Sequence, residues 1–113
     1  GAYFEVFVGS ANYKWGGDHL TNALLFKKDG TEYLRHSSSG DVLPGSDDAQ
    51  DLGSSTKRWA NIYSADLQLS NEGKTNDVDG TWGSYTIQEG EDDLFLINRR
   101  SGKKYKFMLQ EVQ

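Results

Sequence analysis

Apolar and polar residues alternate with a period of two in several short segments of the chain. In the clearest run, residues 62–69, one face carries Tyr63, Ala65, Leu67 and Leu69. Residues 81–87 alternate again, and further short segments with apolar residues cover 3–8, 23–28, 31–36, 93–99 and 103–109. A period of two places successive side chains on opposite faces of a strand. Because no segment shows a sustained apolar period of 3.6 residues, the sequence predicts an all-β fold of short antiparallel strands and hairpins.

Turn residues between these segments predict how the strands pair. Asp29-Gly30 lies between two apolar segments, and this dipeptide suits a hairpin turn that needs positive φ. Residues 100–102, Arg-Ser-Gly, predict a second hairpin near the end of the chain. Its inward side chains are either Leu94 and Leu96 or Phe95 and Ile97.

The segment of residues 37–50 is rich in turn-forming residues. Residues 37–50 contain a serine run, Pro44-Gly45 and Asp47-Asp48, which predict a linker or shaft-like segment with a short Val42-Leu43 contact. We therefore expect two β subdomains. The first, residues 1–45, carries a hairpin and an aromatic loop, and the second covers residues 46–113.

The aromatic loop is the strongest candidate for ligand binding. Residues 12–22 are rich in glycine and asparagine, which predicts an exposed loop. Aromatic faces can stack on sugar rings, and neighbouring amide, carboxylate and imidazole groups can bind hydroxyls. The candidate residues are Asn12, Tyr13, Trp15, Asp18 and His19. The alternative is that Trp15 folds back into a core that is short of aliphatic side chains.

Composition indicates that this chain needs a partner to complete its core. Of its 113 residues, 35% are hydrophobic and 12% aromatic. A chain of this length with few aliphatic residues has little material to cover its own apolar strands. Residues 3–8 carry apolar side chains on both strand faces, so at least one face is expected to meet another chain or layer.

Charge and residue content argue against several classes of partner. The formal net charge of −5 disfavours nucleic-acid binding, because an acidic chain repels phosphates. The basic cluster near the end is expected to be a solvated face or a partner for the acidic residues at 89–93. No apolar run approaches membrane-spanning length, so we expect no membrane insertion. The start at Gly1-Ala2 rather than methionine favours a piece of a longer polypeptide.

Residues suited to catalysis or metal binding are sparse. The chain has no cysteine and two histidines, His19 and His36, and it lacks a Gly-x-Ser-x-Gly elbow. We therefore expect no enzyme activity and no cofactor. Residues 76–80, Asn-Asp-Val-Asp-Gly, faintly resemble a calcium loop, but Thr86 stands where the loop pattern requires glutamate. A polar turn explains this segment equally well, and we predict no metal site.

Residues 51–63 read Asp-Leu-Gly-Ser-Ser-Thr-Lys-Arg-Trp-Ala-Asn-Ile-Tyr. This stretch resembles a recurring element of bacteriophage tail fibres, which typically join a repetitive shaft to a distal tip. The resemblance continues more loosely through residues 69–74 and 103–112. It implies a structural and adhesive virion protein, a parallel homotrimer that recognises a host cell-surface glycan or protein. We expect contacts between the three copies at Arg58, Trp59, Tyr63 and Leu67.

Two other classes of function are compatible with these residues. One is a stand-alone carbohydrate-binding β module, which is commonly monomeric, so the oligomeric state separates it from a fibre. The other is a hydrolase embedded in a fibre, which would need a pair of catalytic carboxylates across a groove.

Overall fold

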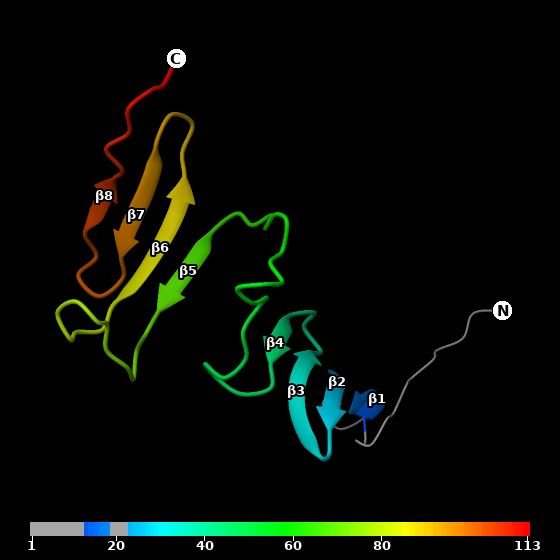
Figure 1. Ribbon diagram of the computed structural model, residues 1–113. Coiled ribbons are helices and arrows are strands. Elements are labelled where there is room, and N and C mark those ends of the chain that lie inside the picture. The colour runs from blue at the N-terminus through cyan, green and yellow to red at the C-terminus, as the bar shows by residue number, and fades with distance from the viewer. Residues whose placement is uncertain (1–12, 19–22) are drawn as a thin grey trace. The chain divides into compact units, whose positions relative to one another are not determined.

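The described part of the chain consists of two antiparallel sheets. The computed structural model describes residues 13–18 and 23–113, which form eight strands and no helix (Figure 1). The all-β prediction is therefore confirmed. Contacts divide the chain into two units, Gly1–Trp59 and Ala60–Gln113. The predicted subdomain boundary after residue 45 lies inside the first unit, and the fibre-like stretch 51–63 crosses the division.

The first unit holds a four-stranded meander in which neighbours in sequence are neighbours in the sheet. Its strands are β1 (Tyr13–Asp18), β2 (Ala23–Lys28), β3 (Thr31–His36) and β4 (Val42–Pro44), in the order β1-β2-β3-β4. At the turn between β2 and β3, Asp29 and Gly30 have φ angles of 50° and 82°. Two successive positive φ values match the twist of the flanking strands. The Asp-Gly hairpin prediction is confirmed.

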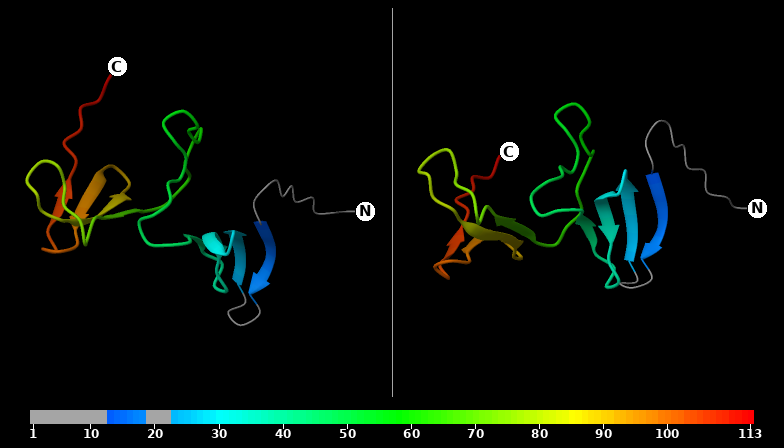
Figure 2. Two further views of the ribbon diagram at one scale, coloured as in Figure 1. Left: turned by 60° about the horizontal axis from the view of Figure 1, so that its bottom comes forward. Right: turned by 90° about the horizontal axis from the view of Figure 1, so that it is seen from below.

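Strand β1 corrects the prediction that residues 12–22 form a loop. Tyr13–Asp18 pairs with β2 along its whole length, from Tyr13 opposite Lys28 to Asp18 opposite Ala23. Figure 2 shows β1 next to β2 at the edge of this sheet. The glycines in this segment indicated a loop, but a strand is held by backbone hydrogen bonds, and the adjacent β2 provides them. The predicted strand at residues 3–8 lies outside the described residues.

The segment predicted as a linker contributes the last strand of this sheet. Strand β4 pairs with β3, and the Gly45 amide extends this pairing by donating to the Tyr33 carbonyl at 2.9 Å. A Cβ on Gly45 would overlap the backbone carbonyl of Glu32. Glycine is therefore required at this position by close backbone approach.

The second unit holds another meander in chain order. Its strands are β5 (Leu67–Ser70), β6 (Ser84–Glu89), β7 (Leu94–Asn98) and β8 (Lys104–Lys106). The strand predicted at residues 62–69 is therefore wrong at its start, since residues 62–66 are irregular. Its alternation is real, but β6 pairs only with Leu67 to Ser70, so the preceding residues have no ladder partner. The predicted final hairpin is confirmed as β7 and β8.

The register of the second sheet separates an apolar face from a polar one. Opposed residues of antiparallel strands point to the same side, and one such row runs Leu67, Ile87, Leu96 and Tyr105. We call this side the apolar face; its apolar and aromatic residues are Leu67, Leu69, Tyr85, Ile87, Leu94, Leu96 and Tyr105, and Glu89 and Asn98 lie on the same side. The opposite side carries mainly Gln68, Thr86, Gln88, Lys104 and Lys106, together with Phe95 and Ile97.

Hydrogen bonds close the polar side of this sheet. Thr86 is fully buried, accepts from Arg99 Nε at 2.9 Å and donates to Gln68 Oε1 at 2.6 Å. Ile97, directly opposite Thr86, is also buried. Of the two candidate pairs in β7, Ile97 thus belongs to the buried side, whereas Leu94 and Leu96 join the apolar face.

The apolar face has no equivalent cover. Leu67 and Leu69 are 50% and 47% exposed. Within residues 23–113, the buried residues are Ala23, Thr86 and Ile97. The described chain therefore leaves a continuous apolar surface in contact with water.

Candidate functional site

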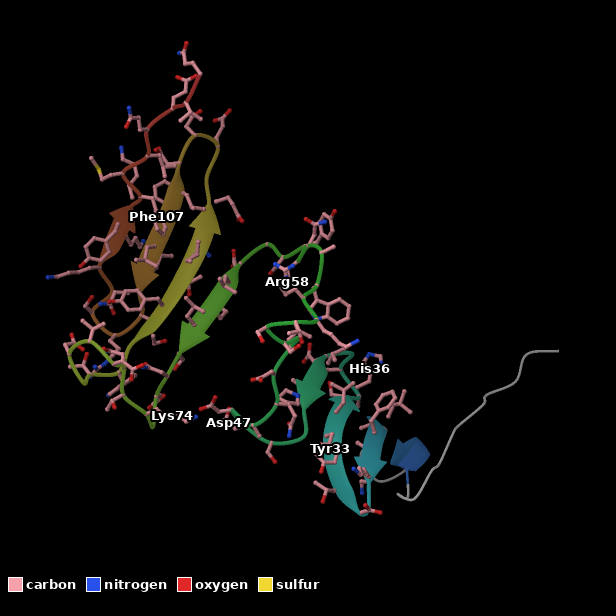
Figure 3. All side chains as sticks on the ribbon, viewed as in Figure 1. Tyr33, His36, Asp47, Arg58, Lys74 and Phe107 are labelled. Atoms are coloured by element: carbon pink, nitrogen blue, oxygen red, sulfur yellow. The ribbon has the colours of Figure 1, made fainter. Side chains whose placement is uncertain are left out.

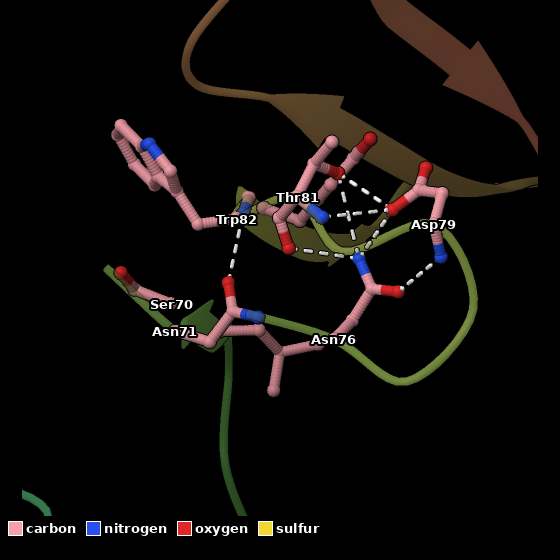
Figure 4. A pocket seen from close by; sticks show the side chains of 9 residues that line it. Ser70, Asn71, Asn76, Asp79, Thr81 and Trp82 are labelled. Carbon is pink, nitrogen blue, oxygen red and sulfur yellow. Dashed lines mark hydrogen bonds between the residues drawn. The ribbon is translucent and has the colours of Figure 1, made fainter. Parts of the chain in front are cut away.

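A shallow hollow in the second unit brings one aromatic ring together with several polar side chains. We call it the Trp82 hollow (Figure 4); its volume is about 480 Å³. Leu69 and Tyr85 of the apolar face reach its wall. The polar and aromatic members are Ser70, Asn71, Asn76, Asp79, Thr81 and Trp82. They lie at the end of β5, in the loop that follows it, and just before β6.

Asn76 organises the loop that forms one side of the hollow. Its Oδ1 accepts from the amides of Val78 at 2.7 Å and Asp79 at 2.9 Å. Its Nδ2 donates to Asp79 Oδ1 at 2.7 Å and to the Thr81 carbonyl at 2.9 Å. An asparagine that bonds backbone two and three residues ahead forms a local turn without help from a sheet.

Asp79 closes the same loop through a single carboxylate oxygen. Besides Asn76, its Oδ1 accepts from the Thr81 amide at 3.1 Å and the Thr81 hydroxyl at 2.7 Å (Figure 4). The bonds from Asn76 and then Thr81 lower the pKa of Asp79 below its ordinary value of 3.8. Asp79 is therefore a fixed negative charge on the rim of the hollow at neutral pH.

This lowered pKa predicts that the loop opens in acid. A carboxylate whose pKa is depressed in the folded state stabilises that state above its unfolded pKa and loses the effect as pH falls through the folded one. We expect the Val78 and Thr81 amide resonances in NMR spectra to shift together below pH 3.8, the ordinary value. The Asp79→Asn variant is the control and should show no such transition. Unchanged resonances in the parent chain at lower pH would contradict this assignment.

Two contacts fix Trp82. The guanidinium carbon of Arg100 lies 3.8 Å from the centre of the indole, and Arg100 Nη1 donates to the Trp82 carbonyl at 3.0 Å. A guanidinium stacked on an aromatic ring is attracted by its negative face. Next to the ring, the Gly83 amide donates to Asn71 Oδ1 at 2.7 Å. The turn that carries Arg100 is held by Asn98 Oδ1, which accepts from the Arg100 amide at 3.0 Å.

The ligand-binding residues predicted from sequence are only partly described. Tyr13, Trp15 and Asp18 belong to β1, whereas Asn12 and His19 lie outside the described residues. Ligand binding by this segment stays a prediction. His36, on β3 (Figure 3), has its Nε2 3.1 Å from the Gly40 carbonyl oxygen.

The four predicted contacts between copies are spread over both units. Arg58 and Trp59 are the last two residues of the first unit, and Tyr63 and Leu67 belong to the second. Trp59 is 63% exposed and Tyr63 93% exposed, so neither side chain fills a core within the described chain. A Cβ on Gly53 would lie 3.4 Å from Cδ1 of Trp59, which places the indole against the preceding turn. No ion pair of Arg58 with a described residue is found.

The two arginines near the end of the chain bind other partners than the acidic turn before β7. Arg99 bonds Thr86, and Arg100 bonds Trp82, so both hold the second unit together instead. Within residues 13–18 and 23–113, no group of three histidine or acidic side chains is placed to hold a metal ion. Over the same ranges, no helix is long and apolar enough to cross a membrane.

Comparisons with protein-family models, with curated proteins and with solved structures find no match for this chain. Its function is therefore inferred from its residues and their geometry.

Proposed function

We propose that the chain is a structural and adhesive part of the distal region of a bacteriophage tail fibre in the virion. It works as a parallel homotrimer that recognises a host cell-surface glycan or protein. The observation that carries this proposal is the uncovered apolar face of the second sheet, with Leu67 and Leu69 half-exposed. The resemblance of residues 51–63 to fibre elements supports it independently.

A symmetric assembly suits the distribution of apolar side chains. Interfaces of obligate oligomers resemble a core cut in half, and a sheet with one bare apolar face is such a half core. Trp59 in the first unit and Tyr63 in the second are further exposed aromatic side chains that such an interface could bury. Cyclic symmetry would also cover the edges of the sheets, which otherwise pair with stray strands.

Solution mass tests this proposal directly. At micromolar concentration, light scattering should give the mass of three chains, because each copy then buries its apolar face against its neighbours. A folded monomer or a stable dimer would contradict the threefold assembly.

The stand-alone carbohydrate-binding module remains the second candidate, and the Trp82 hollow is the observation that favours it. Since such modules are commonly monomeric, the same mass measurement separates the two. In either case we propose a binding role without catalysis. Turnover of capsular or lipopolysaccharide glycans that one carboxylate-to-amide substitution abolishes would contradict this.

A further inference from the structure

We propose that the Trp82 hollow binds a neutral pyranose ring of a glycan. In this site Trp82 offers a stacking surface, and Asn71 and Asp79 offer hydrogen bonds to hydroxyl groups. The hollow would be a host-contacting site of the proposed fibre, so the inference rests on that adhesive function. Its wall residues Leu69 and Tyr85 are next to the Ser70–Ser84 pair that ends the β5–β6 ladder, so the hollow lies at one end of the apolar face. It also places a glycan site in the second unit, away from the segment around Trp15.

Two polar side chains of the hollow are held in place by hydrogen bonds, and each keeps one polar atom without a hydrogen bond to a described residue. Asn71 uses Oδ1 to accept from Gly83, and among the described residues its Nδ2 has no hydrogen-bond partner. Asp79 uses Oδ1 for Asn76 and Thr81, and no described residue bonds its Oδ2. In each of these two side chains, one polar atom is hydrogen-bonded within the protein and the other is available to a ligand. Such preorganisation lowers the entropic cost of binding.

Trp82 is ordered in the same way. The ring is half-buried, and Arg100 stacks on it at 3.8 Å. Because Arg100 also bonds the Trp82 carbonyl, the ring and its backbone are restrained together. Trp82 is one of the residues that line the hollow, and Figure 4 shows its ring on the side of Ser70 and Asn71. A rigid indole with neighbouring donors and acceptors matches a ring that has apolar C–H faces and polar edges.

The chemistry of the lining selects a neutral polyhydroxylated ligand. The ionised Asp79 repels phosphate, sulfate and carboxylate groups and accepts from hydroxyls. A purely aliphatic ligand would cover Asn71 Nδ2 and Asp79 Oδ2 without replacing their bonds to water, which is costly. The volume of about 480 Å³ falls within the usual range for small-ligand sites.

Saturation-transfer NMR on the chain as it assembles in solution tests this inference. The probes are methyl α-mannopyranoside, methyl β-galactopyranoside and methyl N-acetyl-β-glucosaminide, with N-acetylneuraminic acid as the anionic comparison. We expect transfer to the ring C–H protons of at least one neutral pyranoside and much weaker transfer to the anionic sugar.

Two substitutions locate the binding. Trp82→Ala removes the stacking surface and should weaken binding roughly tenfold or more. Asn71→Asp retains an oxygen that can accept from the Gly83 amide but replaces the free donor, and it should also weaken binding several-fold. Tyr33→Ala is the matched control, since Tyr33 is an exposed aromatic residue of the first unit, and it should leave binding unchanged.

Each outcome decides the assignment. If no neutral pyranoside receives transfer, or if Asn71→Asp and Trp82→Ala both bind like the parent, the hollow is not a glycan site. Equal transfer to the anionic sugar would overturn the neutral class. A trimer by light scattering without sugar binding would overturn this site and leave the fibre proposal standing. A monomer that binds sugar through Trp82 would support the hollow as a glycan site and overturn the proposed threefold fibre.

Discussion

The Leu67→Lys variant is expected to be a monomer in solution under conditions where the parent chain gives the mass of three copies. Leu67 lies on the apolar face, opposite Ile87, and is half-exposed in the single chain. Burial of a leucine at an interface stabilises the assembly by about 1.5–3 kcal/mol per copy. A lysine ammonium at the same place adds a desolvation cost when it is buried between copies. In the proposed trimer, three such substitutions would act together.

Val78→Lys is the matched control for this experiment. Val78 is 96% exposed and lies in the loop before β6, outside the strands that form the apolar face. It should therefore assemble like the parent chain. Light scattering over a concentration series measures both variants. If Leu67→Lys keeps the mass of three chains, the apolar face of the second sheet is not the contact between copies.

The Gly45→Ala variant is expected to lose the pairing of β4 with β3. The added Cβ would overlap the Glu32 carbonyl, which is backbone and cannot swing aside as a flexible side chain does. The Gly45 amide would also lose its bond to Tyr33. We expect a destabilisation of about 3 kcal/mol or more, at the high end of single substitutions.

Loss of the NMR cross-strand contact between His36 and Val42, which are paired in the sheet, would report this change. Gly40→Ala provides the comparison, because a Cβ there meets nothing within 4 Å although φ is 95°. It should cost about 1 kcal/mol from backbone strain alone and keep the β3–β4 contact. Equal behaviour of the two variants would show that close approach at Gly45 is not limiting.

The features predicted well from sequence are those set by residues close together in the chain. Asp29 and Gly30 adopt the positive φ values that their side chains favour, so the first hairpin follows from the dipeptide. The final hairpin follows equally from its turn, where Asn98 accepts from the amides of Arg100 and Ser101.

Features that depend on a neighbouring strand were predicted poorly. Tyr13–Asp18 is a strand because β2 lies beside it, although its own glycines indicate a loop. Residues 62–66 alternate like a strand but have no partner, so they stay irregular. Alternation of apolar and polar residues determines which side chains share a face. A strand also needs a neighbouring strand whose backbone it can pair with.

The Trp82 hollow was missed because it joins residues distant in sequence. Asn76, Asp79 and Thr81 are close in sequence and form a local turn. The polar turn offered by the sequence for residues 76–80 agrees with their hydrogen bonds. The stacking of Arg100 on Trp82, however, links the turn after β7 to the residues before β6. No local pattern predicts such a contact.

In both sheets each strand pairs with the strand next to it in sequence. Every ladder therefore closes a short stretch of chain, and chains with such local contacts fold quickly. Each meander can form in a first-order process whose rate does not depend on how many copies are present. In the proposed trimer, docking of apolar faces from separate copies would be a second, concentration-dependent event. Dilution would slow docking but not the formation of each meander. Folded single copies with Leu67 and Leu69 still exposed to water would therefore accumulate before they associate.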